Sequence, residues 1–198
     1  IQPANPGQVV DALGQILADK NNSLDLRLTA AEAMDQLAQA AAEESQRSLG
    51  LDDNIRDRFL DFARAVWSAV LKHGLSADQP LEVRRACLRA FGRITTEMLD
   101  SSVVPQTNEA PPRELDPLLL QKIQESQDRY FHRLADVFAD YSKNAAPLAD
   151  AVRDDDPELR QTALLILVDL ANVRDRLQGL ATGGTPLPSP EPGPGGPT

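Results

Sequence analysis

Apolar residues recur along this chain at intervals of three and four positions, which is the pattern of amphipathic α-helices. The clearest example runs from Gln79 to Asp100, where Pro80 suits the first helical turn. One face of this helix is apolar and comprises Val83, Ala86, Cys87, Ala90, Phe91, Ile94 and Met98. The opposite face carries a basic ridge, formed by Arg85, Arg89 and Arg93. The pattern predicts a central helix that buries one side.

Similar stripes predict further helices before and after the central one. The expected helices span about residues 7–20, 24–49, 52–74, 80–100, 116–141, 148–152 and 157–177. Asn21-Asn22-Ser23 reads as a turn that caps the second helix, and Asp52 and Asp53 suit the N-cap of the third. Gly50 suits the left-handed position after a helix end. The chain therefore belongs to the all-α class.

Two segments interrupt this periodicity. The first, near residues 101–115, holds three prolines and is expected to be an exposed loop inserted between helices. The second runs from 179 to 198 and is rich in Gly, Pro, Ser and Thr. Such a composition cannot offset the entropy of ordering, so we expect a disordered tail or linker there. One helical domain over residues 1–178 is thus expected, and 198 residues with 41% hydrophobic content suffice for its core.

Three of the expected helices share a local pattern. Each has an aliphatic residue before an arginine, followed by small and large apolar residues, at Leu26-Arg27, Val83-Arg84 and Leu159-Arg160. This pattern resembles the second helix of a HEAT repeat, although the spacing between the three helices is irregular. The resemblance implies helical hairpins stacked into a short, irregular HEAT-like solenoid followed by the tail.

The resemblance also implies a role for the arginines of this pattern. In HEAT repeats this position resembles an internal ladder, in which each arginine pairs with a turn acid of a neighbouring unit. Asp78 and either Asp155 or Asp156 are the candidate acids here. The first unit offers Asn and Ser in its turn instead of Asp.

The overall charge narrows the classes of partner. The chain has 30 acidic and 20 basic residues and a formal net charge of −10, which opposes non-specific binding to nucleic acid or to anionic membranes. Its single cysteine cannot form an intramolecular disulfide or a cysteine-based zinc site. This scarcity of cysteine favours a reducing compartment such as the cytoplasm. No apolar run reaches the roughly 18 residues of a membrane span.

Few residues are candidates for catalysis. His73 and His132 lie far apart without the spacing of metal ligands, and Cys87 falls on the apolar face of the central helix. The acids from Asp154 to Asp156 precede Pro157, where they suit helix capping better than a cation site. No phosphate-binding loop or nucleophile elbow is present. We therefore expect no enzyme, no cofactor and no metal.

Two surfaces are candidates for protein binding. The basic ridge would face an acidic partner or a phosphorylated segment, or else is a solvated helix face. The run Leu164 to Val168 makes the last helix apolar all round, so Leu165 and Val168 are also candidates. Either the long helix expected over residues 116–141 covers this run, or the run docks a further repeat, a partner or another copy. The prolines of the tail fit a spacer or a polyproline ligand.

These features predict a non-catalytic module for protein–protein interaction or scaffolding, with another protein as its partner. Two alternatives remain open at this point. The chain is a structural helical segment of a larger polypeptide, or it is a lyase-like accessory subunit, since some bacterial HEAT-like proteins resemble chromophore lyases. Oligomeric state cannot be derived from the sequence.

Overall fold

The computed structural model describes residues 6–47, 53–101 and 117–181, and every regular element within these ranges is helical. The elements are α1 (Pro6–Ala18), α2 (Leu24–Arg47), α3 (Asp53–Ala69), η1 (Val70–Gly74), α4 (Leu81–Ser101), α5 (Pro117–Ser142), α6 (Ala146–Ala151) and α7 (Pro157–Ala181). The predicted all-α class is confirmed. The proline-rich loop from residue 102, the Gly50 and Asp52 caps and the tail from residue 182 lie outside the described residues.

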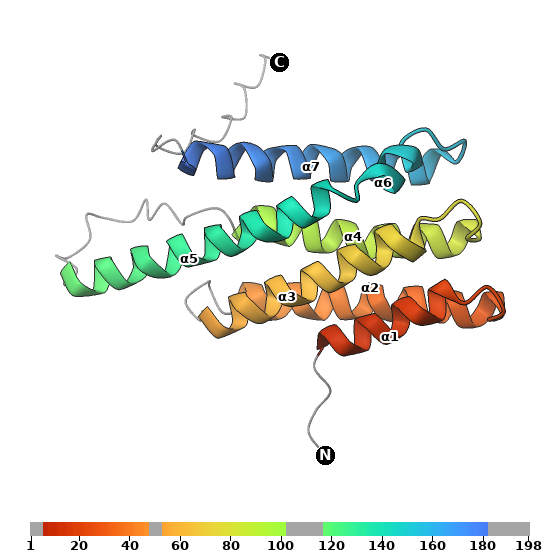
Figure 1. Cartoon of the computed structure of the whole chain (residues 1–198), viewed down its shortest axis with the longest axis horizontal. Coiled ribbons are helices and arrows are strands. Elements are labelled where there is room, and N and C mark those ends of the chain that lie inside the picture. Colours follow the sequence, from red (N-terminus) through yellow and green to blue (C-terminus); the bar gives the residue numbers. More distant parts are fainter. Residues whose placement is uncertain (1–5, 48–52, 102–116, 182–198) are drawn as a thin grey trace, which may run out of the picture.

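The long helices form two layers (Figure 1). In one layer α4 packs between α2 and α7, and in the other α3 packs between α1 and α5. The layers meet where α2 contacts α1 and α3, and where α5 contacts α7. This arrangement leaves α2 and α7 as the two outer helices of their layer, and the short α6 leads into α7.

The core follows the apolar stripe of the central helix. All seven residues predicted for its buried face are fully buried in α4. Phe91 stacks on Trp67 of α3, with ring centroids 5.2 Å apart and planes inclined by 14°. Tyr141 of α5 lies 5.2 Å from Trp67 at a steeper angle. These three aromatic side chains join α3, α4 and α5 at the centre of the molecule, where aromatic pairs stabilise beyond the area that they bury.

The end of α3 differs from the predicted plain helix. From Val70 to Gly74 the chain forms the π-helical turn η1, which closes with a hydrogen bond from the Leu75 backbone N–H to the Val70 carbonyl at 2.9 Å. A Cβ added at Gly74 would lie 2.6 Å from Sγ of Cys87. Only glycine therefore lets this turn approach α4 so closely.

Side chains in the turns cap two helices of the α2–α4–α7 layer. Oγ of Ser23 accepts a hydrogen bond from the Leu26 backbone N–H at 3.2 Å at the start of α2, as predicted for this turn. At the start of α7, Oδ1 of Asp156 accepts from the Leu159 backbone N–H at 2.8 Å. The expected capping role of the acids before Pro157 is thus confirmed for Asp156.

Candidate functional site

Three arginines occupy equivalent positions near the starts of α2, α4 and α7, and two of them connect neighbouring helices of this layer. We call Arg27, Arg84 and Arg160 the ladder arginines. Nη1 of Arg27 donates to Oε1 of Gln79 at 3.0 Å, in the turn before α4. Nη2 of Arg84 donates to Oδ2 of Asp154 at 2.6 Å, in the turn before α7. Each of these two arginines therefore reaches forward to the turn that begins the next helix of its layer.

The partners in these turns are not the predicted ones. Asp78 binds Lys20 and Ser76 instead of Arg27, and these contacts hold its pKa below the usual range, with the Lys20 hydrogen bond contributing most. Gln79, and not Asp78, is the partner of Arg27, because a side-chain amide can both donate and accept hydrogen bonds. Nε2 of Gln79 donates to the carbonyls of Leu17 at 2.7 Å and His73 at 3.1 Å, which leaves its oxygen for the arginine.

In the second turn the partner of the arginine is again not the predicted one. Arg84 pairs with Asp154 rather than with Asp155 or Asp156, because Asp156 caps α7 and accepts from Arg85. Both Asp154 and Asp156 have a pKa lowered from the usual range. For Asp154 the main cause is the hydrogen bond from the Asp156 backbone N–H, followed by Arg84. The turn is therefore fixed by ionised carboxylates.

The basic ridge is tied to acids on both neighbouring helices. Arg85 contacts Asp156 at 2.5 Å and Glu158 at 3.1 Å at the start of α7, and the Asp156 hydrogen bond raises its pKa. The other two ridge residues share a single carboxylate of α2, with Asp35 at 3.5 Å from Arg89 and 2.6 Å from Arg93. Arg89 and Arg93 remain partly exposed, so this end of the ridge keeps positive charge at the surface.

Three large apolar side chains of the last helix are exposed. We call Leu164, Leu165 and Val168 the apolar face of α7; their exposed fractions are 47%, 60% and 57%. Ile166 and Leu170, on the other side of the helix, are buried. The helix α5 contacts α7 but does not cover this face. The alternative that the long helix, now α5, covers the Leu164–Val168 run is therefore wrong.

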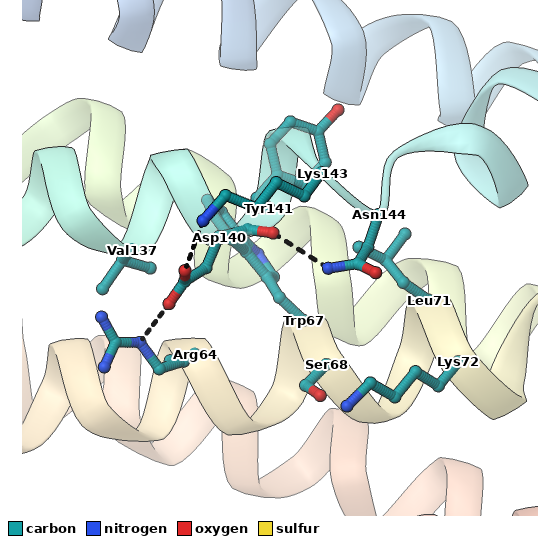
Figure 2. A pocket seen from close by; sticks show the side chains of 10 residues that line it. All are labelled: Arg64, Trp67, Ser68, Leu71, Lys72, Val137, Asp140, Tyr141, Lys143 and Asn144. Carbon is teal, nitrogen blue, oxygen red and sulfur yellow. Dashed lines mark hydrogen bonds and ion pairs between the residues drawn. The ribbon is translucent and has the colours of Figure 1, made fainter.

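A hollow of about 230 Å³ lies between α3 and α5 (Figure 2). Trp67 and Tyr141 line it, and burial raises the pKa of Tyr141 to about 12. At its edge Asp140 bridges Arg64 at 3.3 Å and Lys143 at 3.6 Å. This hollow could not be predicted from the sequence, because it is formed by two helices whose pairing the periodicity alone does not determine.

The residues considered for catalysis differ in burial and in pKa. Cys87 is fully buried, and burial raises the pKa of its thiol to about 12, so the predicted core role is confirmed. His73 is half-buried at the end of η1, where burial and then Lys72 lower its pKa, whereas His132 is exposed on α5. Within the described ranges no group of three His, Cys, Asp or Glu residues is placed to hold a metal ion. None of the helices described is both long and apolar enough to cross a membrane.

The chain has no match among protein-family models, curated proteins or solved structures. Its function is therefore inferred from its own surfaces.

Proposed function

We propose that the chain is a non-catalytic protein–protein interaction module that docks a partner on the apolar face of α7. The observation that carries this proposal is the exposure of Leu164, Leu165 and Val168 together on one helix. Single exposed apolar residues are common, but a contiguous group on one element marks an interaction surface or a ligand groove. Burying such side chains supplies the favourable free energy of association.

The architecture that we propose is a short HEAT-like solenoid. Support comes from the order of the layers, because α2, α4 and α7 follow one another while α1, α3 and α5 do the same beside them. Further support comes from Arg27 and Arg84, which both reach the turn of the next helix in their layer. Stacked units of this kind contact mainly their neighbours, so the outer helices keep surfaces that further units or partners can cover.

The basic ridge would add selectivity to the apolar face. Arg89 and Arg93 share Asp35, so one guanidinium charge at this site is not balanced by that carboxylate. An acidic segment of a partner would complete the balance, and complementary charge acts mainly on specificity and association rate. Arg85 would contribute least, because Asp156 and Glu158 already engage it.

Capture of proteins from an extract of the source cells tests the proposal. Wild type is compared with Val168→Glu, which places a charge on the α7 face, and with Leu118→Glu as the control. Leu118 is the control position because it is also a large apolar residue with more than half of its surface exposed, but lies on α5. We expect Val168→Glu to lose proteins that wild type and Leu118→Glu both retain.

Two further results complete this test. If wild type and both variants retain the same proteins, docking on α7 is contradicted. An Arg89→Glu/Arg93→Glu double variant is then compared with wild type, and loss of the same proteins is expected if the ridge contributes to recognition. All variants should give the wild-type circular dichroism spectrum, since the substituted side chains are exposed.

The same observation also fits a structural segment of a larger polypeptide. In that case a further part of the same polypeptide would cover the apolar face of α7. Adding that part to the chain would then abolish capture of other proteins, whereas a partner-binding module would continue to capture them.

A further inference from the structure

The apolar face of α7 repeats a surface that α4 uses inside the molecule. Leu88 and Gly92 lie four and eight positions after the ladder arginine of α4, and Leu164 and Val168 lie at the same positions after that of α7. On α4 these positions are covered: Leu88 is buried, and a Cβ at Gly92 would lie 3.3 Å from Cδ1 of Ile166 in α7. On α7 they are exposed. The exposed side of α7 therefore corresponds to the side of α4 against which the next helix, α7, packs.

The opposite end of the layer shows the complementary feature on α2. Leu26 directly precedes the ladder arginine of α2, as Val83 and Leu159 do in α4 and α7. Val83 and Leu159 are fully buried, whereas Leu26 is 44% exposed. The exposed residue lies on the helix that has no predecessor: α4 and α7 each follow another helix of the layer, whereas α2 is the first of that layer within the described part of the chain. A preceding helix is what this position lacks.

The turn before α2 also repeats the turn before α4. Asn22 and Gln79 each lie five positions before the arginine of their own helix. Nδ2 of Asn22 donates to the Ile16 carbonyl at the end of α1 at 2.9 Å, as Nε2 of Gln79 donates to the His73 carbonyl at the end of η1. The oxygen of Gln79 accepts from Arg27. Among the residues described, none donates to the equivalent oxygen of Asn22.

The third ladder arginine supplies the missing donor. Nη1 of Arg160 binds the backbone carbonyl of Asp154 in its own turn at 3.2 Å, and Arg160 reaches no later turn within the described ranges. Arg27 and Arg84 both reach forward to the turn of a following helix. Within the described residues, Arg160 therefore lacks an acceptor in a following turn, and the side-chain oxygen of Asn22 lacks an arginine donor from a preceding helix.

From these matches we infer that the chain associates head to tail, with the α7 face of one copy bound to the α2 face of a second copy. Leu164 and Val168 of one copy pack against Leu26 of the next, and Arg160 donates to the oxygen of Asn22. The new contact continues the two internal contacts, α2 with α4 and α4 with α7. Because the two surfaces differ, the contact does not close on itself and successive copies can add.

This inference rests on the proposed function and deepens it, because it names what occupies the α7 face. The net charge of −10 repels neighbouring copies at low ionic strength. At physiological ionic strength charges separated by more than about 8 Å are largely screened. Association should therefore strengthen as salt is raised to that level.

Analytical ultracentrifugation of two complementary variants tests the inference. Val168→Glu blocks the α7 face and keeps the α2 face, whereas Leu26→Glu does the reverse. Both side chains are exposed, so both variants should fold, which circular dichroism checks. Each variant alone should stay at the monomer mass of 21.5 kDa. An equimolar mixture should form a complex of twice that mass and grow no further, because one intact interface remains.

Wild type and Leu118→Glu should both gain mass with concentration. A wild-type chain that stays monomeric at every soluble concentration would overturn the inference, as would a mixture that does not associate or variants that still self-associate alone. A monomeric chain that nevertheless loses captured proteins through Val168→Glu would overturn the head-to-tail contact and leave the proposed function standing.

Discussion

Arg84 of α4 and Asp154 of the turn before α7 form a direct ion pair, with Nη2 and Oδ2 2.6 Å apart and both side chains largely buried. Arg84→Met should lower the free energy of unfolding by about 1 to 3 kcal/mol, because it leaves a largely buried carboxylate without its charged partner. Denaturant unfolding measures this loss. Lys20→Met is the control, since Lys20 and Asp78 pair at the exposed surface, where ion pairs stabilise weakly. Equal losses in the two variants would contradict the role of the ladder.

Asp156 should make stability depend on pH on the acid side. Its pKa lies below the usual 3.8 in the folded chain, first because Arg85 donates to it and then because the Leu159 N–H does. The unfolded chain therefore binds the proton more tightly, so this stabilisation is complete above 3.8 and is lost as pH falls through the folded-state pKa. Asp156→Asn keeps a capping side chain but removes the charge. Its melting temperature should lie below that of wild type near neutral pH and converge with it in acid.

Glu97 should act with the opposite sign. Burial in α4 raises its pKa above the usual 4.5, even though Ser45 and Gln46 of α2 bind its carboxylate. Stability should therefore fall as pH rises from 4.5 through the folded-state pKa, where the buried carboxylate ionises. Glu97→Gln keeps an acceptor for Gln46 and should raise the melting temperature near neutral pH. A gain that persists unchanged in acid would contradict this account.

Gly74 should not tolerate a side chain. An added Cβ would meet Sγ of Cys87 at 2.6 Å, so Gly74→Ala should lower the free energy of unfolding by about 1 to 3 kcal/mol through overpacking. Gly179→Ala is the matched control, because a Cβ there meets nothing within 4 Å and alanine is favoured in a helix by up to about 1 kcal/mol. Thermal unfolding of the two variants should therefore shift in opposite directions. A shift in the same direction would place the π-helical turn farther from α4.

Phe91 tests the aromatic centre. Its ring stacks on Trp67 and lies 6.0 Å from that of Tyr141, so Phe91→Ala should lower the free energy of unfolding by about 3 to 5 kcal/mol. Tryptophan fluorescence during denaturant unfolding follows this loss directly, since Trp67 is the single tryptophan. Leu118→Ala, at an exposed position, should change stability by less than about 0.5 kcal/mol. If Phe91→Ala lost no more stability than Leu118→Ala, α4 would not be the centre of the fold.

The sequence predicted the helices and the buried face of α4 because both follow from spacing within one segment. The seven residues of that face and the cap at Ser23 depend on neighbours a few positions away. Leu165 and Val168 were predicted as binding residues, and they are exposed as such a role requires. Their function in binding remains a prediction.

The features that sequence reasoning missed depend on contacts between distant segments. The π-helical turn follows from the close approach of Gly74 to Cys87, which no local pattern reveals. Gln79 was overlooked because a turn acid was expected, whereas the site needs an amide that donates and accepts at once. The partners of the basic ridge also come from other helices, so the ridge was predicted without Asp35.

Thiol labelling tests most directly whether the apolar face of α7 is covered by another protein. Native Cys87 is fully buried with a pKa of about 12, so a cysteine introduced by Val168→Cys would be the reactive one. Its labelling rate is measured at one low concentration of the labelled chain, in buffer and in a thiol-depleted extract of the source cells, which supplies both partner proteins and native copies of the chain, with Leu118→Cys as the control. We predict slower labelling of Val168→Cys in the extract and an unchanged rate for Leu118→Cys. Equal rates for Val168→Cys in buffer and extract would contradict the assignment of α7 as a docking surface.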